Sequence, residues 1–296
     1  MVISDARQAD SVLDDSRSCG SEAAFTVTFP QKDDSSSPQQ DEEYAEIHTG
    51  TKKQKIRIQD YNAMYSLPGL YEHIVHEQLA CDSPRILVQF LKEHLTSNPA
   101  SSDLVGPLNI LDVAAGNGIV GAELRKQLTD KPGIRRLIGT DLLESARSAA
   151  LRDRPDVYDN YIAADLTQPH ASGLPPSSDI VIICAALGPG DADLPLEAVD
   201  GAITLLREGG LLTLTVNAGG QRAGSSLRWQ SFLACVNGSG GSHWSCLEEI
   251  ARKRYKHRKT VQGRWIEYTV LVYRKAKPET INEIGETVIQ KLMAAI

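Results

Sequence analysis

The sequence predicts an α/β protein with a doubly wound, mainly parallel seven-stranded sheet that ends in an antiparallel hairpin. The first observation is that short apolar runs alternate with helical patterns between residues 108 and 216. Such alternation is typical of a parallel sheet with helices on both faces. The second is that two strand-like segments, 252–259 and 264–275, are separated only by a short turn at Gln262-Gly263. Strands joined so closely must pair antiparallel.

Two helices are expected before the sheet. Pro68 and Gly69 interrupt the chain, and the residues from about 70 to 79 have a helical pattern. Ser83-Pro84 supplies an N-cap and a first helical position for a second helix, whose apolar residues from Ile86 to Leu95 share one face.

Five apolar segments predict the parallel strands. The first is a short run with a charged residue near its end, a pattern that favours a strand. The five segments are 108–114, a run ending at Asp141, a run ending at Asp165, 179–185 and 209–216. Helices are expected between them at about 119–128, 143–152 and 196–206.

The two ends of the chain differ from this central part. Residues 1–50 hold 11 acidic and 3 basic residues, which leaves 27 acidic and 28 basic residues in the rest of the chain. We expect 1–50 to be a flexible acidic extension. Within it Phe25, Val27 and Phe29 alternate, which is compatible with an edge strand or a segment that docks on the folded part, but an isolated apolar patch is the favoured interpretation. We expect residues 51–277 to form the folded domain. Residues 278–296 predict an amphipathic helix that caps the sheet or pairs with a second copy in a homodimer.

Composition excludes several classes of protein. No stretch approaches the roughly 18 consecutive apolar residues that a membrane-spanning helix needs. The five cysteines are odd in number and contain no C-x-x-C pair, which argues against a disulfide scaffold and a zinc knuckle. The first residues lack the apolar core of a secretory signal. We therefore expect a cytoplasmic protein without a metal site.

A glycine-rich loop follows the first parallel strand. Gly116, Gly118 and Gly121 satisfy G-x-G-x-x-G, and Asp141 lies 20 residues further on, the spacing of a nicotinamide dinucleotide site. Asp112 argues for a different ligand, because a carboxylate projecting into the crevice would repel an anionic pyrophosphate. The same carboxylate would attract the ammonium and sulfonium groups of S-adenosylmethionine.

The motifs together resemble those of class I S-adenosylmethionine-dependent methyltransferases, and more narrowly the Williams–Beuren syndrome chromosome-region methyltransferase-like group. The resemblance covers about residues 56–275 and includes NILDVAAGNGIVGAEL, ICAALGPGDADLP and EYTVLVYRK. It implies the class I methyltransferase fold and S-adenosyl-L-methionine as the cofactor. It also implies that the segment from about 55 to 100 is a helical lid. Ala114 departs from the pattern, because many members have a glycine there.

The resemblance assigns roles to the residues at the strand ends. Gly116 and Gly118 would let the backbone approach the methionine and ribose, and Asp112 would hold the amino group through backbone or water. Asp141 would accept hydrogen bonds from the ribose hydroxyls, and Leu142 would cover the adenine. The remaining expected cofactor-binding residues are Ala114 in the loop, Asp165 and Leu166 near the adenine, and Cys184 near the sulfonium.

The acceptor is harder to predict, because methyl transfer requires no acid or base side chain. Candidate catalytic or substrate-contacting residues are Tyr65, Tyr71, His73 and His76, of which the two histidines are expected to share a solvent-facing side of a helix. The basic run 252–259 alternates its charges between two faces of a strand, which favours a solvated edge. Cys184-Ala185-Ala186-Leu187 also stands where enzymes that methylate planar nitrogens have an N-P-P-Y-type tetrapeptide. We therefore expect a small-molecule acceptor, with neither a nucleic acid nor a membrane as partner.

Two other functions remain open. The glycine loop would also suit a nicotinamide-dependent oxidoreductase. The acidic extension and the amphipathic final segment would suit a catalytically silent methyltransferase fold that serves as an assembly or regulatory subunit.

Overall fold

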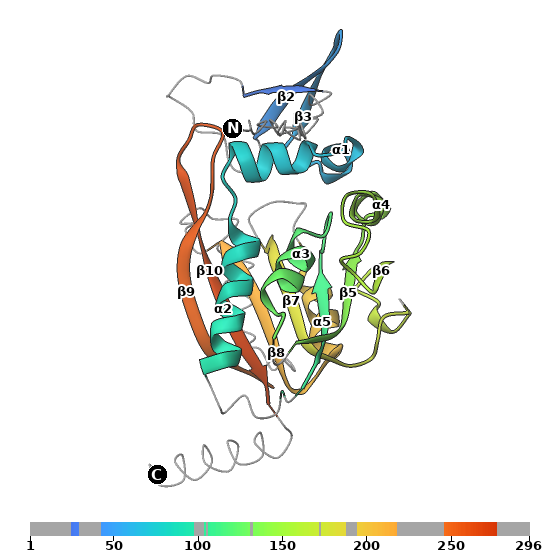
Figure 1. Cartoon of the computed structure of the whole chain (residues 1–296), viewed down its shortest axis with the longest axis vertical. Helices are drawn as coiled ribbons and strands as arrows, with labels where there is room; N and C mark the ends of the chain where they lie inside the picture. The colour runs from blue at the N-terminus through green and yellow to red at the C-terminus, as the bar shows by residue number, and fades with distance from the viewer. Residues whose placement is uncertain are drawn as a thin grey trace, which may run out of the picture.

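The computed structural model describes residues 25–29, 43–97, 104, 106–130, 133–171, 173–187, 194–217 and 246–276. Its main element is a seven-stranded sheet in the order β6-β5-β4-β7-β8-β10-β9 (Figure 1). The strands are β4 Leu108–Val113, β5 Ile134–Asp141, β6 Asn160–Ala163, β7 Ser178–Leu187, β8 Leu206–Asn217, β9 Leu247–Lys259 and β10 Trp265–Lys275. Strands β4 to β8 pair in parallel, whereas β10 pairs antiparallel with both β8 and β9. The predicted fold class is confirmed.

Helices cover both faces of this sheet. Helices α2 (Ser83–Ser97) and α3 (Ile119–Gln127) pack with Leu108 and Ile110 of β4 on one face, while α5 (Leu196–Thr204) packs with Leu111 and Val113 on the other. Successive residues of a strand point to opposite faces, so β4 supplies both cores. Figure 1 shows α2 and α3 in front of the strands, with α4 (Glu144–Asp153) beyond the β5–β6 side. The predicted alternation of strands and helices is therefore present.

A second, smaller sheet lies beyond the predicted domain boundary. Strands β1 (Thr26–Thr28), β2 (Tyr44–Thr49) and β3 (Lys52–Arg57) pair antiparallel in that order. Phe25 is buried in its core with Ile47, so the residues expected to form an isolated patch belong to a packed unit. The start of the folded part at residue 51 is thus too late, because β2 completes a sheet that β3 cannot form alone.

A buried ion pair fastens this small sheet to the hairpin of the large one. Arg258 of β9 donates to Glu43 Oε2 over 2.7 Å, and both side chains are almost fully buried. The other Glu43 oxygen accepts from the Val261 backbone N–H at 2.8 Å. A buried pair of this kind is costly to break, since removing one partner leaves an uncompensated charge.

The segment between the two sheets is only partly the helical lid that was expected. It contains α1 (Tyr61–Ser66) and a π-helix, η2 (Glu72–Gln78), where the sequence predicts a helix over about 70–79. The segment begins with strand β3, and its longest helix, α2, packs on the sheet instead of covering the strand ends. The predicted helix over 278–296 lies outside the described residues. In the described part, no helix is long and apolar enough to span a membrane.

Candidate functional site

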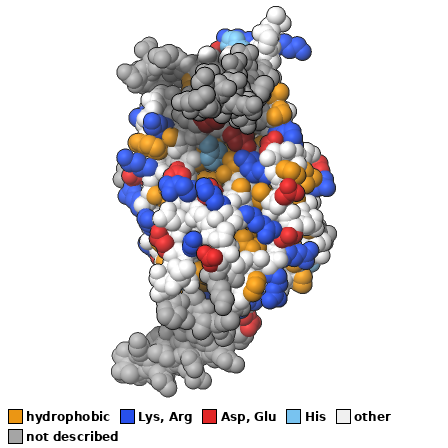
Figure 2. Space-filling view, viewed as in Figure 1, with side chains coloured by type: hydrophobic (Ala, Val, Ile, Leu, Met, Phe, Trp, Pro, Cys, Tyr) orange, Lys and Arg blue, Asp and Glu red, His pale blue; other side chains and the backbone are white. Residues whose placement is uncertain are grey.

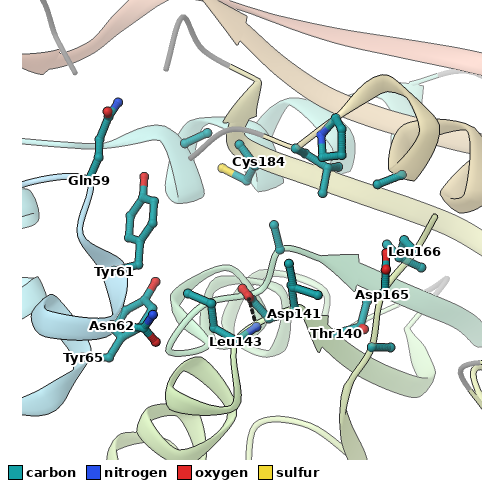
Figure 3. Close-up of a pocket in the computed structure, with 18 of the residues that line it drawn as sticks. Gln59, Tyr61, Asn62, Tyr65, Thr140, Asp141, Leu143, Asp165, Leu166 and Cys184 are labelled. Atoms are coloured by element: carbon teal, nitrogen blue, oxygen red, sulfur yellow. Dashed lines mark hydrogen bonds between the residues drawn. The ribbon is translucent and has the colours of Figure 1, made fainter. Parts of the chain in front are cut away.

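A cavity of about 550 Å³ opens at the carboxyl ends of β5, β6 and β7. In Figure 3, Gln59, Tyr61, Asn62 and Tyr65 form one side, Thr140, Asp141, Asp165 and Leu166 form the other, and Cys184 lies between them. Its size is in the range of cavities that hold small ligands. The cavity is lined by Gln59, Asp60, Tyr61, Asn62, Tyr65, Tyr71, Ala114, Thr140, Asp141, Leu142, Leu143, Ala164, Asp165, Leu166, Thr167, Cys184, Ala185, Ala186, Leu194, Pro195 and Ala198.

Asp141 connects this cavity to the glycine loop. As the last residue of β5, it accepts hydrogen bonds from the backbone N–H of Gly116 at 3.1 Å and of Leu143 at 3.0 Å (Figure 3 shows the second). Burial raises the pKa of the Asp141 carboxyl, and these backbone donors partly oppose the rise. The sequence therefore placed Asp141 correctly at a strand end, while its bond to the loop comes from the tertiary structure.

The glycine loop has a backbone that few residues adopt. Ala114, Gly116 and Gly118 have positive φ angles of 54°, 54° and 88°. At Ala114 this conformation is strained, which explains physically why a glycine suits that position. A Cβ on Gly116 would overlap the Tyr65 hydroxyl, so the loop also needs glycine for packing within the chain itself.

Asp112 does not project into the cavity, which corrects the prediction. Its side chain is fully buried beneath the loop, where Tyr158 Oη donates to Asp112 Oδ2 at 2.7 Å. Its other oxygen, Oδ1, has no partner among the described residues. Burial raises the Asp112 pKa to about 7, although the Tyr158 hydrogen bond lowers it. Side chains alternate between the two faces of a strand, so Asp112 points to the same face of the sheet as Leu108 and Ile110, the face covered by α3.

Residues that follow β5 and β6 line the cavity. Leu142 exposes 67% of its surface while lining the cavity, unusual for a large apolar side chain in the described part. Asp165 lies two residues beyond the end of β6, and its Oδ1 accepts from the backbone and hydroxyl of Thr167. These bonds lower the Asp165 pKa. Leu166 lines the cavity and also packs in the core against α5.

The comparisons with known proteins give one partial curated relative and several solved structures of low identity. No protein-family model matches the sequence. A curated relative, methyltransferase-like protein 27 of Homo sapiens, is 32% identical over 137 residues, which is 45% of this chain. The match spans about half the length of that relative, 48%.

Three solved structures also match. N-methyltransferase NodS of Bradyrhizobium japonicum with S-adenosyl-L-homocysteine has 15% identity, a TM-score of 0.40 and coverage of 66% of this chain and 100% of that chain. Magnesium protoporphyrin IX methyltransferase of Synechocystis has 15% identity, a TM-score of 0.42 and coverage of 65% and 79%. An rRNA methylase of Streptococcus thermophilus has 16% identity, a TM-score of 0.38 and coverage of 60% and 92%.

What decides the fold is the sheet itself, whose antiparallel β10 lies between β8 and β9. The chain has the class I methyltransferase fold. This is the layout implied by the resemblance, and the layout differs from the all-parallel sheet of dinucleotide-binding folds.

Within this methyltransferase fold, Cys184 and Ala185 form the cavity wall at the end of β7. Ala185 has a positive φ of 56°, and its N–H donates to Thr215 Oγ1 at 2.8 Å. Cys184 is half-buried, and burial raises the pKa of its thiol. A neutral thiol and two small alanines leave room beside them without adding charge.

Three tyrosines of the N-terminal segment cover the strand ends of the methyltransferase fold. The ring centroids of Tyr61, Tyr65 and Tyr71 lie 5.2 to 6.4 Å apart, and all three rings line the cavity. Burial raises the pKa of both Tyr65 and Tyr71. The two tyrosines predicted as candidates are therefore at the site, together with Tyr61, which the sequence analysis did not select.

The two histidine candidates are not equivalent. His73 is partly exposed, with Nδ1 2.7 Å from Glu77 Oε2 and its ring packed edge-on against Phe25, and it does not line the cavity. His76 is half-buried, donates to the Cys81 carbonyl at 2.8 Å and lines a narrow space of about 50 Å³ beside Gly116. Burial lowers the His76 pKa. The expectation that both histidines face solvent on one side of a helix is wrong for His76. The turn of a π-helix is wider than that of an α-helix, so residues three apart no longer lie on one face.

A small polar network holds the N-terminal segment on the glycine loop. Glu72 Oε1 accepts from Asn117 at 2.6 Å and from Arg154 at 2.8 Å. Arg154 also donates to the Asn117 carbonyl at 3.0 Å, and Arg152 donates to the Tyr65 carbonyl at 3.1 Å. No local sequence signal connects these residues, so sequence reasoning missed them.

The residues present fit the methyl donor that the fold implies. The buried Asp112 Oδ1, which has no partner among the described residues, provides a hydrogen-bonding position below the loop, and Asp141 and Asp165 supply acceptors along the cavity. No group of three or more His, Cys, Asp or Glu residues in the described ranges is arranged to hold a metal.

Proposed function

We propose that this chain is an S-adenosyl-L-methionine-dependent methyltransferase that acts on a small molecule. The observation that carries the proposal is Asp141, a carboxylate that ends β5, hydrogen-bonds to the glycine loop at Gly116 and lines a 550 Å³ cavity. A carboxylate in this place suits the two hydroxyls of a ribose. The partial match to methyltransferase-like protein 27 supports the same reading.

Each cavity residue then has a physical task. Leu142 provides an apolar face for an adenine ring, and Asp165 accepts from an exocyclic amino group. The Asp112 charge attracts the donor's ammonium group through the loop, while Gly116 and Gly118 shape the backbone around it. When bound, the donor supplies an activated methyl group, so the chain's part is to hold an acceptor lone pair in line with it.

The small-molecule acceptor is supported by what covers the cavity. Tyr61, Tyr65 and Tyr71 lie over the strand ends, and the Glu72 network holds their segment in place. A small molecule can occupy the space between this segment and the strand ends without displacing the segment.

The basic run on β9 gives further support. Arg252 pairs with Glu249, Arg254 pairs with Glu267, and Arg258 is buried with Glu43. The ammonium groups of Lys256 and Lys259 each lie 5.4 Å from the Trp265 ring. Figure 2 shows Lys and Arg side chains interspersed with Asp and Glu on the viewed face. Charges engaged in this way are less available to phosphates.

Calorimetric titration with S-adenosyl-L-homocysteine tests the donor site, and NADH serves as the competing ligand. We expect S-adenosyl-L-homocysteine to bind and NADH not to bind. In the Asp141→Ala variant, affinity should fall by roughly 1.5 to 3 kcal/mol, the value of hydrogen bonds to a charged group. Unchanged affinity in a variant that melts cooperatively would remove Asp141 from the site, whereas NADH binding would favour an oxidoreductase.

Two assays test the remaining parts of the proposal. Labelled methyl transfer to a metabolite extract separates an enzyme from a silent assembly subunit. Fluorescence anisotropy with tRNA and duplex DNA at two salt concentrations tests the absence of a nucleic-acid partner. We expect nothing tighter than the non-specific range of about 10⁻⁴ to 10⁻⁶ M. The cytoplasmic location and the homodimer through 278–296 stay predictions.

A further inference from the structure

The cavity has one side that the proposed donor contacts do not use. Asp141, Leu142 and Asp165 lie toward the β5–β6 side, whereas Gln59, Asp60 and Tyr61 come from the N-terminal segment on the other side (Figure 3 shows Gln59 and Tyr61 there). Tyr71 and Ala185 line the main cavity, the narrow space beside the glycine loop, and a third space of about 40 Å³ that reaches Tyr268 of the hairpin. These two residues therefore mark the junction between the proposed donor site and the rest of the cavity.

The charge of the main cavity restricts what binds there. Its described lining residues include three carboxylates, Asp60, Asp141 and Asp165, and no Lys, Arg or His. Arg258, a buried cation that lines the third space, is already paired with Glu43. Among these described lining residues an anionic acceptor would find repulsion and no cationic partner, while a cation would be attracted.

The aromatic side chains also favour a positively charged ligand. The faces of Tyr61 and Tyr71 attract cations within about 6 Å of a ring centroid, and the two centroids are 6.4 Å apart. The chain's own acidic groups nearby are also held neutral, since burial raises the pKa of Tyr71 and of Cys184. A phenol or thiol acceptor would meet the same penalty when it ionised to attack.

Gln59 adds a hydrogen-bonding requirement. Its side-chain Oε1 is buried and has no hydrogen-bond partner among the described residues, and Gln59 lines both the main cavity and the third space. A buried acceptor without a partner is costly, so a ligand with an N–H or O–H donor would be stabilised there. Asp60 lies next in the chain and uses Oδ1 for the Ala63 N–H.

We propose that the acceptor is a small amine that binds between Gln59, Asp60 and the rings of Tyr61 and Tyr71 and is methylated on nitrogen. This inference rests on the proposed methyltransferase function. The bound ammonium first loses one proton to water. The nitrogen lone pair then forms the N–C bond as the S–C bond breaks, and the bonding pair stays on sulfur. The methylated nitrogen is an ammonium, which the same carboxylate and rings stabilise.

Three probes that share one ring and differ in charge test this inference. The full chain, saturated with S-adenosyl-L-homocysteine, is titrated at pH 7.5 with phenethylamine, 2-phenylethanol and phenylacetate, and binding is measured by ligand-observed saturation-transfer NMR. We expect the amine to bind about tenfold more tightly than the alcohol and phenylacetate to bind more weakly than both. An amine that binds no better than the alcohol or phenylacetate overturns the inference.

Matched variants locate the effect. Asp60→Asn keeps the bond to the Ala63 N–H and should reduce the amine's advantage over the alcohol several-fold. Asp82→Asn, which changes a carboxylate outside the cavity at the start of α2, should leave that advantage unchanged. Tyr71→Leu should weaken the amine more than the alcohol. Equal preference in the Asp60→Asn and parent chains contradicts the placement. The affinity for S-adenosyl-L-homocysteine, measured separately by calorimetry, reports whether the donor site itself is intact.

Discussion

The Tyr158 hydroxyl donates a 2.7 Å hydrogen bond to the buried Asp112 carboxylate directly beneath the glycine loop. The Tyr158 ring also fills the space next to Gly118, Gly121 and Gly139, where an added Cβ would lie 2.6 to 3.1 Å from ring atoms. These glycines are thus needed for a side chain of the protein as well as for the loop. One tyrosine positions both the loop and the charge below it.

Replacing Tyr158 by Phe should weaken the donor site in a pH-dependent way. The hydrogen bond lowers the Asp112 pKa, so its loss should raise that pKa and leave less negative charge at pH 7. We expect the affinity for S-adenosyl-L-homocysteine, measured by calorimetry, to fall several-fold at pH 7 and to recover partly at pH 8.5. Tyr273→Phe, which removes a hydroxyl bonded to Glu249 on the hairpin, is the control. An equal loss at both pH values would contradict a role through Asp112.

Asp112 should make the protein less stable as the pH rises from about 4 to about 7. The folded-state pKa is about 7 against 3.8 in the unfolded chain, so in this window the folded state binds more protons and stability falls with pH. Above pH 7 this loss of unfolding free energy is complete, and it is on the order of 4 kcal/mol. Urea unfolding at pH 4.5 and 8 should show that Asp112→Asn gains stability relative to the parent at the higher pH. If the difference in unfolding free energy between Asp112→Asn and the parent were the same at both pH values, the Asp112 pKa would not be raised in the folded state.

Gly121→Ala should destabilise the protein, although the same change in an ordinary helix stabilises it by about 1 kcal/mol. The new Cβ would lie 2.6 Å from Tyr158 Cζ and Val157 Cγ1, and overpacking of this kind costs about 1 to 3 kcal/mol. A double-mutant cycle with Tyr158→Ala, followed by urea unfolding, should show that the cost shrinks once the ring is absent. Additive effects would mean that Tyr158 does not cause the constraint.

Glu43→Ala should cost about 3 to 5 kcal/mol in unfolding free energy, because it leaves Arg258 buried without its partner. Glu46→Ala, three residues further along in β2, removes the more exposed pair with Lys53 and should change stability little. A chain that starts at Thr51 lacks β1 and β2 and should melt earlier than the full chain. Equal stability of the Glu43→Ala and Glu46→Ala variants would contradict the fastening role of the buried pair.

Most of the large sheet could be predicted because its signals are local. Apolar runs with glycine or charged ends marked β4 to β8, and the turn at Gln262-Gly263 required an antiparallel hairpin. The small sheet could not be predicted in this way, because five of the six β3 residues are exposed and mostly charged, leaving Ile56 as its buried residue. Its partner strand lay in a segment whose acidic composition indicated an extension.

The sequence by itself determined the order of strands and helices, the loop of glycines and the carboxylates Asp141 and Asp165 near two strand ends, since each depends on neighbours along the chain. The tertiary structure alone decided that Asp112 is buried under the loop, that Tyr65 lies against Gly116 and that Glu43 pairs with Arg258. Tyr158 and Asp112 are 46 residues apart, and Glu43 and Arg258 are 215 apart. Contacts over such separations depend on how whole elements pack, and no local periodicity encodes them.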